Sequence, residues 1–143
     1  MDFLSSCGGA NFFVPYLVKL AVVVVKVVVP LDSLEGLESE VAEHFGRAPY
    51  FALVELEGGE ARVEFFENPR RLGRPPGAYV AEMGVDYVAI KGGIGVKALA
   101  LLRERGVKVL EVEGGKLRDV VEALKAGKYR EYTGEGCPGR RGP

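Results

Sequence analysis

The chain has 143 residues, of which 48% are apolar and 27% charged, so it fits one globular domain with its own core. The formal net charge of −1 excludes the broad positive field that attracts nucleic acids or anionic membranes. Two distant cysteines, Cys7 and Cys137, and a single histidine, His44, exclude a disulfide framework and a four-ligand structural zinc site, which favours a reducing, cytoplasmic setting.

Residues 1–21 do not resemble the start of a folded domain. The apolar run Phe12–Val29 is interrupted by a proline and two lysines, whereas a membrane-spanning helix needs about 20 mostly apolar residues. Met1–Ala10 also lacks the basic residues that begin a signal peptide. We therefore expect no membrane attachment, and we interpret residues 1–21 as a disordered extension or a misassigned start.

The first elements of the domain follow from the residues around Pro30. The valine-rich run 22–29 predicts a buried strand of a parallel sheet. Leu37–Phe45 places three apolar residues on one helical face and predicts a short helix that ends at Gly46. Tyr50–Leu56 and Ala61–Phe66, separated by two glycines, predict an antiparallel hairpin.

The rest of the chain alternates helices with strands after an arginine- and proline-rich loop. The pattern predicts a helix over 78–83, a strand over 85–90, a helix over 96–105, a strand over 107–112, a helix over 116–126 and a flexible tail over 128–143.

Right-handed crossovers place the strand at 85–90 beside the strand at 22–29. With the strands numbered along the chain, we predict a mixed five-stranded α/β sheet of order 3-2-1-4-5. Strand 2 is antiparallel, and helices cover both faces. This arrangement is ribonuclease-H-like. The folded domain is expected over 22–127.

Ligands of such sheets bind where the winding changes direction, beyond the carboxyl ends of the strands. The turn Gly92–Gly95 follows one of these strands and precedes a helix, so its N–H groups could contact an anion. The alternative is a tight turn without a ligand. The turn matches neither the dinucleotide fingerprint nor the phosphate loop of nucleotide-binding proteins.

His44 is the best borderline metal ligand in the predicted domain, although it could simply cap the end of the predicted helix. Arg47 is either a surface charge or part of a basic rim around the glycine turn. The other expected members of that rim are Arg70, Arg71, Arg74, Lys91 and Lys97.

Catalysis has little support in the sequence. The run 22–29 contains none of the carboxylates with which a nuclease of this fold binds metal ions. A single histidine offers no Ser–His–Asp arrangement, and Cys137 lies in the predicted tail. We therefore expect a protein that is not an enzyme.

Several segments together resemble the dinitrogenase iron–molybdenum cofactor biosynthesis family, which includes NifX-like and NafY-like carriers and the C-terminal part of NifB. The similarity covers roughly residues 24–127. It rests on Leu37–Val41, His44–Phe51, Glu67–Pro69, Gly84–Asp86, Gly92–Gly95 and Gly106–Val109.

The resemblance implies a non-catalytic carrier of an iron–molybdenum cofactor or its iron–sulfur precursor, with cofactor-biosynthesis proteins as partners and no nucleic acid. It implies a metal-ligand role for His44. The implied cofactor contacts also include Arg47, Asn68, Gly92, Gly93, Ile94 and Gly95. A core without cysteine suits weak, transient holding. We expect a monomer or weak dimer. The alternative function is a metal-free regulatory module that binds a small anion at Gly92–Gly95.

Overall fold

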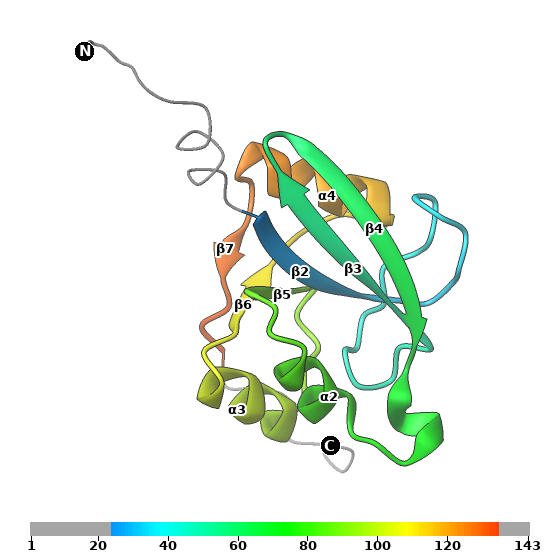
Figure 1. The fold of residues 1–143 in the computed structure, drawn as a ribbon, viewed down its shortest axis with the longest axis vertical. Helices are drawn as coiled ribbons and strands as arrows, with labels where there is room; N and C mark the ends of the chain where they lie inside the picture. Colours follow the sequence, from blue (N-terminus) through cyan, green and yellow to red (C-terminus); the bar gives the residue numbers. More distant parts are fainter. Residues whose placement is uncertain (1–23, 135–143) are drawn as a thin grey trace, which may run out of the picture.

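The computed structural model describes residues 24–134, which fold around one mixed sheet with the strand order β4-β3-β2-β5-β6-β7 (Figure 1). The strands are β2 (Val24–Leu31), β3 (Tyr50–Glu57), β4 (Glu60–Glu67), β5 (Tyr87–Ile90), β6 (Lys108–Glu111) and β7 (Arg130–Glu131). The helices are α2 (Pro76–Glu82), α3 (Val96–Glu104) and α4 (Leu117–Ala126), with a short 3-10 helix η1 (Pro69–Leu72).

The predicted strand order is found in the first five of these strands. β3 pairs antiparallel with β2 and β4, whereas β2, β5 and β6 run parallel to one another. The expected count of five strands is wrong, because β7 adds a short antiparallel edge to β6. Gly127 allows this return, since it ends α4 at a φ of 73°, which a glycine adopts without strain.

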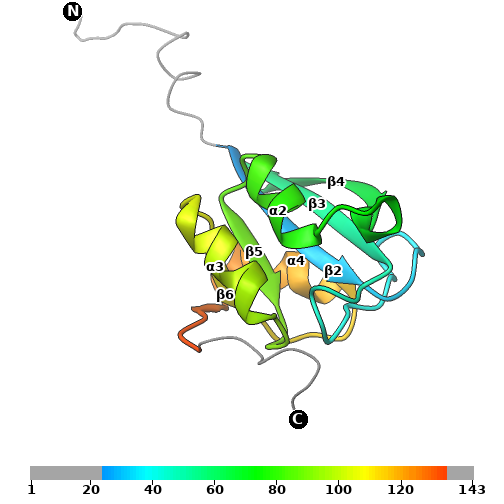
Figure 2. The ribbon, with the colours of Figure 1, turned by 90° about the horizontal axis from the view of Figure 1, so that it is seen from below.

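Two apolar clusters form the core, one on each face of the sheet. α2 and α3 bury Val80, Leu99 and Leu102 against one face, and α4 buries Leu117 and Val120 against the other (Figure 2). Fully buried valines of β2 alternate between the two clusters, as a strand covered on both sides requires. The expectation of helices on both faces is therefore confirmed.

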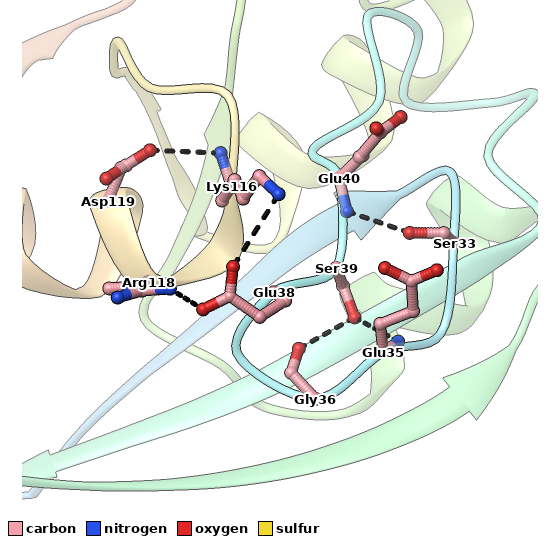
Figure 3. A network of polar contacts seen from close by, with 9 residues as sticks. All are labelled: Ser33, Glu35, Gly36, Glu38, Ser39, Glu40, Lys116, Arg118 and Asp119. Atoms are coloured by element: carbon pink, nitrogen blue, oxygen red, sulfur yellow. Dashed lines mark hydrogen bonds and ion pairs between the residues drawn. The ribbon is translucent and has the colours of Figure 1, made fainter.

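Residues 32–45 differ most from the expectation, because they form an irregular loop and the predicted helix over 37–45 is wrong. Ser39 is fully buried in this loop. Its hydroxyl accepts a hydrogen bond from the N–H of Glu35 and donates one to the carbonyl of Gly36, each at 2.7 Å (Figure 3). These bonds close a turn that a helix could not accommodate.

The same loop caps the N-terminus of α4, which explains why it is not helical. The carbonyls of Leu37 and Ser39 accept hydrogen bonds from the first two N–H groups of α4, at 2.9 and 2.8 Å. The side chain of Glu38 also pairs with Arg118 on the first turn of that helix (Figure 3). A helix over 37–45 would use these carbonyls in its own hydrogen bonds and leave the N–H groups of α4 without partners.

Residues 1–23 and 135–143 lie outside the described residues. These ranges contain residues 1–21, most of the predicted tail and both cysteines, so the predictions made for them lie outside the described residues. Of the helices within 24–134, none has the length and apolar character needed to cross a membrane.

Candidate functional site

The carboxyl ends of β2 and β5 meet at one edge of the sheet, and the winding changes direction there. β2 pairs with the antiparallel hairpin on one side and with β5 on the other. Two segments lie at this edge: residues 41–49, which precede β3, and residues 91–95, which follow β5. The N–H of Phe45 donates to the carbonyl of Gly93 at 2.7 Å and joins the two segments.

Buried neighbours hold His44 at the surface of this edge. The N–H of Ala42 donates to the carbonyl of Pro30 at 2.9 Å, which fastens the segment to the end of β2. Phe45 is fully buried, and its ring centroid lies 5.2 Å from that of Phe51 in β3. His44 lies between these anchors and is exposed. It caps no helix, because none ends there.

Gly93 makes close contact with the backbone and the ring at His44. A Cβ atom at position 93 would lie 2.3 Å from the carbonyl oxygen of Glu43 and 2.8 Å from Nδ1 of His44. Both distances are shorter than real Cβ contacts, so only glycine fits here. The structure thus brings together His44 and Gly93, two of the predicted site residues.

The other residues of the glycine turn have different roles. Gly92 adopts a φ of 128°, which favours glycine, and Ile94 is buried in the core. Gly95 is the N-cap of α3 and makes no side-chain capping bond. The side chain of Ile94 therefore faces the core, and the turn can offer a ligand mainly its backbone.

Carboxylates balance the charge around the glycine turn, which the sequence did not indicate. Lys91 lies 4.0 Å from Glu43. Glu111 pairs with Arg130 at 3.5 Å, and its Oε2 lies 3.6 Å from where a Cβ on Gly92 would lie. The register could have revealed Glu111, because Ile90 pairs with it across the parallel strands. The turn is therefore not an uncompensated basic site.

Asn68 is buried and holds the loop after His44 in place. Its side-chain nitrogen donates to the carbonyls of Gly46, at 3.2 Å, and Ala48, at 2.7 Å. Its side-chain oxygen accepts from the N–H of Arg70 at 2.8 Å and caps η1. Because both ends of the amide form hydrogen bonds within the protein, Asn68 orients the loop.

A pocket of about 340 Å³ lies beside this loop, and we call it the arginine pocket. Arg47 lies on the loop itself, while Arg70 and Arg71 belong to η1. Its lining comprises Gly46, Arg47, Ala48, Pro49, Tyr50, Asn68, Arg70 and Arg71. Two predicted site residues, Arg47 and Asn68, therefore share a pocket that the glycine turn does not line.

The cations of the expected basic rim have different surroundings. Arg74 pairs with Glu82 at 3.4 Å and lies 5.0 Å from the ring centroid of Tyr79, next to α2. Lys91 stays at the turn and Lys97 lies on the first turn of α3. Arg47, Arg70 and Arg71 share the arginine pocket, and Arg71 also lines a neighbouring pocket with Arg74.

The described residues offer a metal at most a small donor set. Within 24–134 no group of three or more His, Cys, Asp or Glu side chains could hold a metal ion. The imidazole of His44 makes no hydrogen bond or ion pair with another described residue. Its ring is therefore available as one nitrogen ligand on a backbone segment held by buried neighbours.

The chain is similar in sequence and fold to several known proteins. An uncharacterized protein of Methanocaldococcus jannaschii is 27% identical over 119 residues, which cover 79% of this chain and 96% of that protein. The crystal structure of the protein PH0822 is 30% identical with a TM-score of 0.64, and the match covers 76% of this chain and 96% of that one. The NMR structure of a Thermotoga protein, provisionally named NifB, is 26% identical with a TM-score of 0.61, covering 80% and 99%.

The family model described as dinitrogenase iron-molybdenum cofactor matches residues 25–127. This range contains His44, Asn68 and the glycine turn. Because the match spans well over half of the sequence, the chain belongs to the dinitrogenase iron–molybdenum cofactor family.

Proposed function

We propose that this chain is a small non-catalytic carrier that receives and releases an iron–molybdenum or iron–sulfur cluster during metallocofactor biosynthesis. The family membership supports the assignment to cofactor biosynthesis. The strand order and the helices on both faces support a ribonuclease-H-like assignment of the domain. We place this domain at residues 22–127, and β7 extends its sheet to Glu131. The partners are then other cofactor-biosynthesis proteins in the cytoplasm.

One observation carries the proposal: an exposed imidazole rests on a glycine that no other residue could replace. The Nδ1 side of His44 faces Gly93. The close contact limits the rotation of the ring, and no hydrogen bond to another described residue competes for its nitrogens. A cluster carrier needs a ligand that is accessible and already oriented, because ordering a flexible side chain would weaken binding.

The donor set fits a cargo better than a permanent cofactor. Iron–sulfur clusters are normally held by several cysteine thiolates, and residues 24–134 contain no cysteine. Imidazole binds iron, but a single imidazole gives one point of attachment. A cluster bound in this way exchanges readily with a partner that offers more ligands.

The alternative is a metal-free module that binds a small anion at Gly92–Gly95. Gly95, the N-cap of α3, has no side chain to accept hydrogen bonds from the first N–H groups of the helix. These N–H groups can bind an anion, which favours this alternative. The carboxylates of Glu43 and Glu111 near the turn oppose it, because they repel an anion. We therefore place the carrier first.

The test is anaerobic loading of the purified protein, with isolated iron–molybdenum cofactor in one arm and an iron–sulfur cluster in another. Iron, molybdenum and visible absorbance are measured after gel filtration. We expect His44→Ala to retain about tenfold less metal than the wild type, because the only imidazole is gone. His44→Cys should restore retention, since thiolate is the usual ligand of iron in clusters.

Equal retention by His44→Ala and the wild type would remove His44 from the ligand assignment. Absence of retention in all three proteins, with unchanged circular dichroism, would overturn the carrier proposal. The anion module would then be tested by titrating small phosphorylated ligands.

A further inference from the structure

Asn68 bonds to backbone carbonyls in the lining of the arginine pocket. Its side chain donates to the carbonyls of Gly46 and Ala48, and its backbone N–H donates to the carbonyl of Pro49 at 3.0 Å. Three carbonyls of the lining thus accept hydrogen bonds from one buried residue. Each of these carbonyls is a neutral acceptor that already holds one hydrogen bond, whereas a guanidinium bonds more strongly to a charged oxygen.

Two of the three guanidinium groups also lack a carboxylate partner. Arg47 and Arg70 form no ion pair with any residue in the part of the chain that the structure describes. Nη2 of Arg70 lies 3.5 Å from where a Cβ on Gly46 would lie, so this guanidinium covers the loop that follows His44. Like charges gathered without a counter-charge raise the free energy of the empty pocket, and an anion relieves it.

The third guanidinium has a partner that a ligand can displace. Arg71 pairs with Glu67 at 3.0 Å, but the two side chains are 74% and 64% exposed. Such an exposed pair contributes at most about 1 kcal/mol, so an anion inside the pocket can compete for Arg71. Glu67 then acts as a weak internal competitor of the ligand.

We propose that the arginine pocket binds a small oxyanion of the carboxylate or phosphate type, at a site separate from His44 and from the glycine turn. The planar fork of arginine matches carboxylate and phosphate oxygens in pairs, which lysine cannot do. A volume of about 340 Å³ has room for a compact anion. The inference does not require that His44 binds a cluster.

The test uses the full chain and isothermal titration calorimetry with two probes, inorganic phosphate and citrate, at low salt. We expect the double variant Arg47→Gln/Arg70→Gln to weaken binding of the preferred probe at least about tenfold, because two charge-assisted pairs are lost. Arg105→Gln is the control. Arg105 is exposed at the end of α3, has no ion pair with any described residue and does not line the pocket.

A pair of carboxylate variants distinguishes binding through specific contacts in the pocket from attraction by the net charge of the protein. Glu67→Gln frees Arg71 and should tighten binding several-fold. Glu82→Gln makes the same change in net charge but frees Arg74, which does not line the pocket, and should change affinity less than about twofold. Equal tightening by both variants, or equal binding by the double arginine variant and the wild type, would overturn the proposal.

The anion could be free in solution or a group carried by the cluster, and both sources share the same chemistry. Titration of the cluster-loaded wild type distinguishes them. Unchanged phosphate or citrate affinity indicates a free ligand, and lost affinity indicates that the cargo supplies the anionic group. If no cluster is retained but the apoprotein binds either probe through Arg47 and Arg70, the carrier proposal fails and the oxyanion site stands. No binding of either probe to the wild type would sink the oxyanion site.

Discussion

The glycine turn and the arginine pocket lie at the same end of the sheet, but they differ in packing and in charge. At the turn, backbone and ring approach closely and the charges are balanced: Lys91 lies near Glu43, and Glu111 pairs with Arg130. In the pocket, the packing is open and Arg47 and Arg70 have no counter-charge among the described residues. The turn is thus suited to positioning one side chain and the pocket to attracting an anion.

Different forces fix the two regions. The turn depends on steric fit, since His44 keeps its place only because Gly93 has no side chain. The pocket depends on hydrogen bonds, since the buried amide of Asn68 fixes the loop and η1 together. The comparison therefore predicts that each region can be disturbed separately.

Gly93→Ala should have the largest effect on stability. The new Cβ would meet the carbonyl oxygen of Glu43 at 2.3 Å, so the segment around His44 must move. We expect a loss of about 2 to 3 kcal/mol in the free energy of unfolding, as for overpacking elsewhere. Urea denaturation measures this loss, and cluster retention should fall with it.

Gly95→Ala is the matched control for that variant. A Cβ at position 95 meets no atom within 4 Å, and the backbone φ is −71°. The expected loss is below about 1 kcal/mol, from replacing glycine at a helix N-cap. If the two variants were equally stable, the close contact at Gly93 would not be the constraint that positions His44.

Asn68→Ala should come second and should affect mainly the arginine pocket. A buried carbonyl, a partly buried carbonyl and the N–H of Arg70 lose their partner, which costs about 2 kcal/mol in the free energy of unfolding. Asn68→Ser keeps an oxygen for the cap but cannot reach the carbonyls, so it should recover part of the stability. Phosphate or citrate affinity should fall in both variants, while metal retention at His44 should change less. A larger loss of metal than of anion binding would contradict the separation of the two regions.

Much of the fold could be predicted because local and long-range signals agree. The valine run of β2 and the two glycines of the hairpin specify strands and their pairing without tertiary information. The loop 32–45 could not be predicted in this way. Its apolar spacing indicates a helix. The carbonyls of Leu37 and Ser39 instead accept hydrogen bonds from the first N–H groups of α4, which lies far away in the sequence.

The site could be predicted only in part, for a related reason. The sequence suggested His44 and the glycine turn as candidate site residues, and a parallel bridge between His44 and Gly93 brings them together in the fold. It could not show that one basic rim divides into a balanced turn and a separate pocket, because that depends on which carboxylate each cation meets. Asn68 was expected to contact a cofactor, whereas its buried hydrogen bonds show how it holds the loop.

Lys91→Gln should have the smallest effect and provides a direct check of the balanced turn. Lys91 lies 4.0 Å from Glu43, whose side chain is 68% exposed, so the pair contributes less than about 1 kcal/mol to stability. We expect the midpoint of thermal unfolding to change little. Because the turn is balanced by carboxylates while the pocket is not, phosphate or citrate affinity should stay within about twofold of wild type, in contrast to the double arginine variant. A loss of anion affinity in Lys91→Gln as large as that of Arg47→Gln/Arg70→Gln would mean that the two regions act as one basic surface.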